Sequence, residues 1–142
     1  MSSFSFRYIE ERGIWRPKIP LLFNAKGIET ELVGLIDSGS DFIIIPKDIA
    51  DALGIELSKK TEDADGVGGP IKLKTGRVNI VLFKKGLMKR VMRNIEVRVP
   101  VNEKCGFDDI LLGRKPFFEY FKTIEFDENL KRVKLVPNRK SP

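Results

Sequence analysis

Histidine is absent from this chain of 142 residues, and cysteine occurs once, at Cys105. A Ser-His-Asp triad, a Cys-His dyad and a histidine-ligated zinc site all require histidine, so none of them can be built within the chain. A single cysteine excludes an internal disulfide, which fits a reducing compartment. Acid–base chemistry must therefore come from carboxylates, with Lys or Tyr as helpers.

Long hydrophobic runs are also missing. No stretch approaches the roughly 18 uninterrupted apolar residues of a membrane span, and Met1–Glu11 has no apolar core of signal-peptide length. We therefore predict a cytoplasmic protein that does not contact a membrane. The length suits one domain and is too short for two. The predicted division is an N-terminal strand or extension at 1–17, a main domain at 18–136 and a basic tail at 137–142.

Basic residues outnumber acidic residues by 26 to 20, which gives a net charge of +6. Such an excess fits either a polyanion partner or a solvated surface. The basic residues are dispersed, and their densest groups, Lys84-Lys85 and Lys89-Arg90-Arg93, surround an expected turn. Aromatic residues are not interleaved with them as a platform for stacking bases. We therefore predict a solvated surface and do not expect nucleic acid as a partner.

Short apolar runs separated by turn residues predict a mainly β fold, a closed or partly open β-barrel with one or two short helices. Residues 46–53 are expected to form a helix that Gly54 stops, and residues 116–120 a second one. The polar, glycine-rich segment 62–70 is expected to interrupt the strands. The expected strands are residues 19–23, 30–36, 42–45, 71–83, 87–99, 109–113, 122–126 and 132–136.

Asp37 stands between two of these apolar strands, in the segment Leu35-Ile36-Asp37-Ser38-Gly39-Ser40-Asp41. An ordinary turn would explain the segment, because Asp and Ser bond to local backbone and Gly tolerates positive φ. The apolar strands on both sides favour a functional role for Asp37, because an unpaired charge near a core is costly and needs a reason. Asp37 is therefore the candidate catalytic carboxylate.

Several elements in this order resemble the retropepsin-like aspartic peptidases, the half-size relatives of pepsin. The Asp-Ser-Gly signature at Leu35–Asp41 is followed by Ile44-Ile45-Pro46 and by the expected helix with Ile49–Gly54. Gly66-Val67-Gly68-Gly69 stands where the family has its glycine-rich flap. Ile110-Leu111-Leu112-Gly113-Arg114 resembles the family's second apolar-Gly element. The resemblance covers the whole predicted main domain and implies the retropepsin-like type of barrel.

The resemblance implies an aspartic endopeptidase that acts as a homodimer, because pepsin-like chains carry the signature twice and this chain carries it once. The two Asp37 carboxylates would share a proton and activate a water that hydrolyses peptide bonds in extended, apolar-rich segments. The substrate would be a peptide or an unfolded protein. No metal and no cofactor are implied.

Family roles transfer to the neighbours of Asp37. Ser38 would bond the partner's loop, and Gly39 would allow close backbone approach and donate its amide to a carboxylate. Residues expected to bind substrate lie on the loop and the flap: Ser40, Asp41, Gly66, Val67, Gly68 and Gly69. Residues expected to support the site follow the second apolar strand: Leu112, Gly113 and Arg114. Arg114 would pair with Asp41, although both could be plain surface charges.

One alternative stays open, a catalytically weak or inactive peptide-binding or assembly module with the same fold. A fold does not dictate its function. The flap region is also unusually acidic, with Glu62, Asp63 and Asp65. The other explanation of the flap segment is a mobile turn without a role.

Overall fold

A computed structural model of the chain describes residues 3–66, 69–84, 88–101 and 108–138. Strands dominate, with one α-helix and one 3-10 turn in this part of the chain. In chain order the elements are β1 (Phe4–Arg7), β2 (Ile9–Glu11), β3 (Ile14–Arg16), β4 (Lys18–Ala25), β5 (Ile28–Ile36), α1 (Lys47–Leu53), β6 (Glu62–Gly66), β7 (Gly69–Lys84), β8 (Met88–Pro100), β9 (Ile110–Leu112), η1 (Phe118–Tyr120), β10 (Phe121–Asp127) and β11 (Arg132–Pro137).

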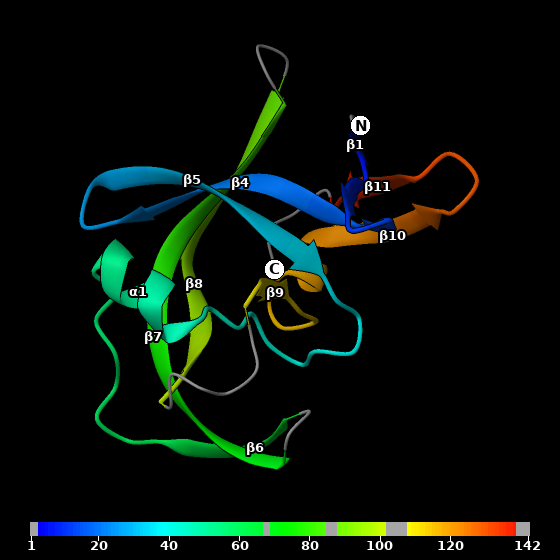
Figure 1. Cartoon of the computed structure of the whole chain (residues 1–142). Helices are drawn as coiled ribbons and strands as arrows, with labels where there is room; N and C mark the ends of the chain where they lie inside the picture. The colour runs from blue at the N-terminus through cyan, green and yellow to red at the C-terminus, as the bar shows by residue number, and fades with distance from the viewer. Residues whose placement is uncertain (1–2, 67–68, 85–87, 102–107, 139–142) are drawn as a thin grey trace.

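The main sheet has six strands, in the order β6-β7-β4-β5-β9, with β8 also paired to β7 (Figure 1). Its pairs are antiparallel except β5 with β9, which run parallel with Gly34 opposite Ile110. The mainly β prediction is confirmed. Hydrogen-bonded pairing does not close this sheet into a barrel within the described residues.

Two smaller units complete the chain. Strand β1 pairs with β11, with Phe4 opposite Leu135, and β11 pairs with β10 to form a three-stranded sheet at the upper right of Figure 1. The hairpin β2–β3 stands apart from both sheets in its hydrogen bonding. The two strands predicted at 122–126 and 132–136 are present and pair as a hairpin, and the N-terminal residues supply three strands. None of the described helices is long and apolar enough to cross a membrane.

The single α-helix follows the sequence prediction. Helix α1 begins after Pro46 and ends at Gly54, whose φ of 73° is left-handed and whose N–H bonds to the carbonyls of Ala50 and Asp51. Glycine suits this position because it has no Cβ to clash in that conformation. The second predicted helix shrinks to the three-residue 3-10 turn η1, with Tyr120 buried.

Residues 42–45 are buried as predicted, but they do not form a strand. Ile43, Ile44 and Ile45 are at most 5% exposed. Ile43 and Ile45 exchange backbone hydrogen bonds with Arg98 of β8, whereas Ile44 exchanges bonds with Leu111 of β9. Alternate residues therefore bond to opposite neighbours, which leaves isolated bridges in place of a ladder. The apolar run at residues 42–45 therefore predicted burial correctly, but it did not predict a strand correctly.

The described residues of the glycine-rich interruption predicted at 62–70 belong to two paired strands instead. Strand β6 pairs with the start of β7, and Gly66 lies opposite Gly69 at its end. A segment with several acidic side chains can still form an antiparallel strand, provided that these side chains lie on a solvated face of the sheet. The hairpin reaches away from the rest of the molecule at the bottom of Figure 1. Val67 and Gly68 lie outside the described residues, as does Cys105.

Lys18, at the start of β4, is a buried cation that joins three segments. Its Nζ donates to Glu11 Oε2 and to Asp109 Oδ1, each at 2.8 Å. These bonds connect the hairpin β2–β3 and the approach to β9 with the strand beside β5. Burial alone would lower the pKa of Lys18, but the hydrogen bonds to Asp109 and Glu11 outweigh it, so the pKa is raised above 10.5.

Lys18→Met is expected to lower the free energy of unfolding by about 1 to 3 kcal/mol near neutral pH. A cation whose folded pKa is raised stabilises fully below its unfolded pKa of 10.5, and this stabilisation is lost as the pH rises through the folded value. The difference between wild type and Lys18→Met should therefore shrink above about pH 11. Urea unfolding of wild type and Lys18→Met near neutral pH and above about pH 11 measures this difference in the free energy of unfolding. Lys134→Met, whose exposed partner Glu125 lies 3.8 Å away, is the control and should have little effect. A difference independent of pH would contradict the assignment.

Candidate active site

The loop that carries Asp37 is held by backbone hydrogen bonds at both of its ends. The Asp37 N–H donates to the Leu112 carbonyl at 3.1 Å, so the loop leaves β5 beside the end of β9. The Arg114 N–H donates to the Ser40 carbonyl at 2.9 Å, and the Lys115 N–H to the Asp41 carbonyl at 2.8 Å. The parallel pair of β5 and β9 thus continues into two loops that fix each other.

The Asp37 carboxylate is oriented by its own loop. Its Oδ1 accepts a hydrogen bond from the Gly39 N–H at 2.9 Å, so the hydrogen bond predicted from the Gly39 amide to a carboxylate is present. Ile36 is buried, Asp37 is half-buried, and Ser38 and Gly39 are exposed. Within the described residues no donor reaches Asp37 Oδ2, which leaves one carboxylate oxygen available at the surface.

Close backbone packing at Gly113 supports the loop. Leu112 and Gly113 are both buried. A Cβ at Gly113 would lie 2.5 Å from the Ser40 carbonyl oxygen and closer still to that of Phe42. Real Cβ atoms do not come this near to backbone oxygens, so only glycine lets the two loops approach. The predicted role of Leu112, Gly113 and Arg114 in supporting the site stays a prediction, and the close packing at Gly113 is consistent with it.

The predicted ion pair between Asp41 and Arg114 is not formed among the described residues. Both side chains are exposed, and no contact within 4.0 Å joins them. Their segments are joined through the main chain instead, by the bonds from Arg114 and Lys115. The Asp41 and Arg114 side chains are therefore not held by each other.

A cleft of about 440 Å³ lies between the Asp37 loop and the β6–β7 hairpin. It brings together four of the five predicted loop residues, all except Ser38, and residues of the hairpin. The residues that line it are Asp37, Gly39, Ser40, Asp41, Phe42, Ile44, Asp63, Ala64, Asp65, Ile71, Leu73 and Leu111. Gly66 and Gly69, predicted to bind substrate, lie opposite each other where β6 pairs with β7, and Gly69 is not part of this lining.

Sequence reasoning missed the apolar floor of this cleft, formed by Phe42, Ile44, Ile71, Leu73 and Leu111. The period-2 spacing of Ile71 and Leu73 is the signal that could have placed both on one face of a strand. Phe42 and Ile44 had been expected only as buried strand residues. The floor offers apolar contact beside a carboxylate, which is the combination that an extended apolar peptide requires.

A buried arginine sits behind the floor. Arg98 of β8 is 8% exposed, and its Cζ lies 4.3 Å from the centroid of the Phe42 ring. Its Nε contacts Glu62 at the base of β6 at 3.3 Å, and its Nη1 bonds to Glu96. One guanidinium therefore connects the floor of the cleft with the foot of the hairpin.

Arg98→Met is expected to lower the free energy of unfolding by about 1 to 3 kcal/mol, because a stacked ring and two charged hydrogen bonds lose their partner. Arg77→Met is the matched control, since exposed Arg77 also pairs with Glu96, at 3.6 Å. It should change stability by less than about 0.5 kcal/mol. Hydrogen exchange of the β6 amides should accelerate only in Arg98→Met. Equal effects of the two variants would contradict a special role for Arg98.

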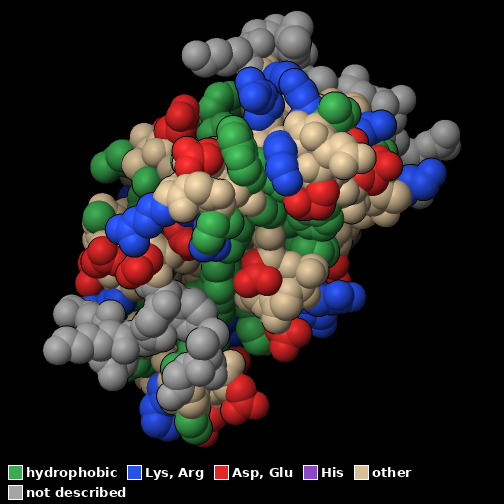
Figure 2. Space-filling model, turned by 45° about the vertical axis from the view of Figure 1, so that its right-hand side comes forward, with side chains coloured by type: hydrophobic (Ala, Val, Ile, Leu, Met, Phe, Trp, Pro, Cys, Tyr) green, Lys and Arg blue, Asp and Glu red, His purple; other side chains and the backbone are tan. Residues whose placement is uncertain are grey.

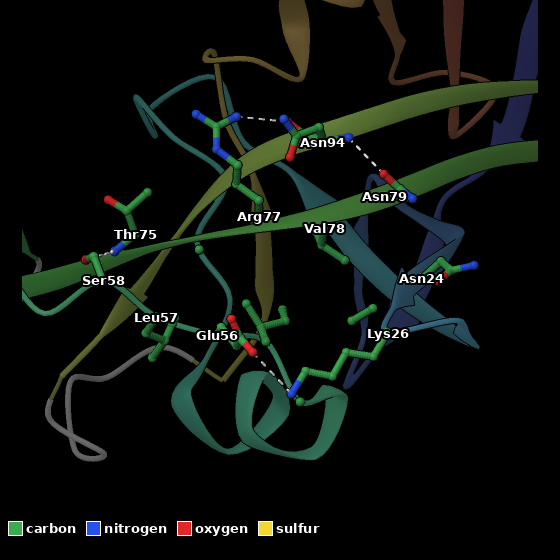
Figure 3. Close-up of a pocket in the computed structure, with 14 residues that line it drawn as sticks. Asn24, Lys26, Glu56, Leu57, Ser58, Thr75, Arg77, Val78, Asn79 and Asn94 are labelled. Carbon is green, nitrogen blue, oxygen red and sulfur yellow. Dashed lines mark hydrogen bonds and ion pairs between the residues drawn. The ribbon is translucent and has the colours of Figure 1, made fainter.

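A larger hollow, of about 620 Å³, lies where the β4–β5 turn, the end of α1 and the middle of β7 meet (Figure 3). Its polar groups already bond to each other. Lys26 pairs with Glu56 at 3.6 Å, and Arg77 donates to the Asn94 carbonyl at 3.0 Å. Asn79 Oδ1 accepts the Asn94 N–H at 2.8 Å. No carboxylate there is free and half-buried as Asp37 is, so this hollow is a poor candidate for catalysis.

The structure combines a mainly β fold with a loop that carries Asp37 and a β-hairpin on the other side of the cleft. A sequence model of the aspartyl protease family matches residues 23–115, which include the Asp37 loop, the hairpin and β9. The chain belongs to this family. No curated protein matches it significantly.

Solved structures share the fold. A retropepsin-like aspartic protease from Rickettsia conorii is 20% identical, with a TM-score of 0.62 over 94% of this chain and 91% of that one. The EIAV protease, in complex with an inhibitor, is 23% identical, with a TM-score of 0.51 over 75% of this chain and 88% of that one. Both likenesses establish the retropepsin-like fold.

Proposed function

We propose that the protein is an aspartic endopeptidase with Asp37 as its catalytic carboxylate. The observation that carries this is the position of Asp37. Its half-buried carboxylate, fixed by the Gly39 amide, opens into a cleft with an apolar floor beneath a β-hairpin. Membership of the aspartyl protease family supports the same reaction. In this proposal Ser38 and Gly39 belong to the catalytic loop, and Ser40 and Asp41 contact the substrate.

The proposed active unit is a homodimer. Aspartic chemistry needs two carboxyl groups, and the signature occurs once in this chain. Two Asp37 side chains at a two-fold axis would share one proton, because like charges about 3 Å apart do not both ionise. The ionised group takes a proton from water, and the protonated group polarises the scissile carbonyl. The exposure of Ser38 and Gly39 leaves this loop accessible to a second copy.

The proposed substrate is an extended peptide or an unfolded protein in the cytoplasm. Extended segments bind by main-chain hydrogen bonds along strand edges, while alternate side chains enter pockets. The β6–β7 hairpin offers such an edge, and Ile71 and Leu73 present the apolar surface.

Purified protein is expected to hydrolyse an unfolded protein and an apolar peptide library somewhere between about pH 3 and pH 8. A pepstatin-type inhibitor should block this hydrolysis. Specific activity should also rise with protein concentration, in step with the dimer fraction measured by sedimentation. Peptide binding without hydrolysis at any pH would contradict the proposal and favour the binding or assembly module.

A further inference from the structure

The cleft differs in charge from the molecule around it. The chain has 26 basic and 20 acidic residues, and on the face in Figure 2 the two kinds of side chain are interspersed. Among the described residues, the lining of the cleft includes four aspartates, Asp37, Asp41, Asp63 and Asp65, and neither lysine nor arginine. A concave site lined by one sign of charge concentrates ligands of the opposite sign.

Most of this negative charge is not neutralised locally. Asp63 pairs with Lys72 at 2.9 Å, and both side chains are well exposed. Within the described part of the chain, the side chains of Asp41 and Asp65 have no ion pair or hydrogen bond. The cation behind the floor, Arg98, is already held by two glutamates. Asp41 and Asp65 therefore remain available to a ligand.

The arrangement suits an organic cation better than a metal ion. Among the residues that the structure describes, no three His, Cys, Asp or Glu side chains gather closely enough to hold a metal. The carboxylates instead border the apolar floor of Phe42, Ile44, Ile71, Leu73 and Leu111. Lysine and arginine match this surface, because each carries a long apolar stem and a charged head.

We infer that the cleft selects peptide segments with a lysine or arginine next to an apolar residue, and that Asp41 and Asp65 determine this specificity. The apolar stem and its neighbour lie on the floor while the cationic head reaches a carboxylate at the border. This inference rests on the proposed function, since it assigns a substrate class to the same cleft.

Binding to the Asp37→Asn protein tests the inference without turnover. The probes are fluorescent apolar peptides that differ at one position, which is Lys, Gln or Glu, and anisotropy gives Kd. The Lys peptide is expected to bind about tenfold more tightly than the Gln peptide at low salt, and the Glu peptide most weakly. The Lys preference should decrease as salt is added. Equal Kd values for the three peptides would overturn the inference.

The matched variants carry Asp41→Asn and Asp65→Asn together, or Asp48→Asn alone, in the same Asp37→Asn background. Asp48 is exposed on α1 and does not line the cleft. The Lys-to-Gln ratio of affinities should fall towards one in the first variant and persist in the second. A ratio that survives in the first variant would overturn the role of Asp41 and Asp65.

Hydrolysis by the otherwise wild-type protein separates the two proposals. The ratio of kcat/KM between Lys and Gln peptides should also fall about tenfold with the paired substitution. Absence of hydrolysis with a retained Lys preference in binding would defeat the proposed peptidase and leave the specificity standing. Hydrolysis without any Lys preference would support the proposed peptidase and overturn the inferred specificity.

Discussion

Replacing Asp37 with asparagine is expected to lower peptide hydrolysis by about 10²- to 10⁴-fold, the usual contribution of a general acid–base group. The amide has nearly the same shape, and its oxygen can still accept the Gly39 N–H. It cannot take a proton from water, so chemistry fails while the loop stays intact. Urea unfolding should place Asp37→Asn within about 0.5 kcal/mol of wild type. Asp48→Asn, the same change on α1, is the activity control. Full activity in Asp37→Asn would remove Asp37 from catalysis.

Mixing subunits extends this prediction to the dimer. If each active site needs two Asp37 carboxylates, equal amounts of wild type and Asp37→Asn that exchange freely should retain about a quarter of the dimers in active form. Activity per total protein should then fall to about a quarter of that of pure wild type at the same total concentration. About half of the activity would remain if each chain worked alone, and that outcome would contradict a shared site.

Gly113→Ala is expected to destabilise the protein by about 3 kcal/mol or more and to abolish hydrolysis. The added Cβ would meet the backbone carbonyls of Ser40 and Phe42 at 2.5 Å or less. Neither carbonyl can simply turn away, because Ser40 O accepts the Arg114 N–H and Phe42 O accepts the Ser40 hydroxyl. The two loops must separate, and the Asp37 loop loses its support.

Gly27→Ala is the control for an added methyl group. No atom of the described residues lies within 4 Å of its Cβ position, although its φ of +80° strains any side chain. It should cost about 1 kcal/mol and leave hydrolysis unchanged. Urea unfolding and peptide hydrolysis compare both variants with wild type. A Gly113→Ala protein as stable and active as Gly27→Ala would contradict the steric account.

The features that sequence predicted correctly depend on local chemistry. Helix α1 needed only Pro46 at its start and Gly54 at its end, and the C-terminal hairpin needed only two alternating runs around a turn. The Asp37 loop was recognisable because its residues adjoin each other in the chain.

The features that sequence missed depend on residues far apart in the chain. Residues 42–45 lie between β8 and β9, which no local pattern reveals. The link from Arg98 to Glu62 and Phe42 joins three separate segments, so spacing alone could not suggest it. The expected pair of Asp41 and Arg114 failed for the same reason. Its loops are adjacent, but hydrogen bonds of the main chain join them, and no ion pair forms between the two exposed side chains in the described part of the chain.

The pairing of early strands with late ones also orders events during synthesis. Asp37 is translated long before Leu112, whose carbonyl accepts a hydrogen bond from the Asp37 N–H, and Phe4 is translated long before its partner Leu135 of β11. Contacts between such distant residues form slowly, because closing the intervening chain costs entropy before any contact compensates it. A nascent chain that ends before β9 has the aspartate but not the support that positions it. The fold thus delays assembly of the cleft until β9 and the residues that follow it have been translated, because the loop that carries Asp37 is fixed by them.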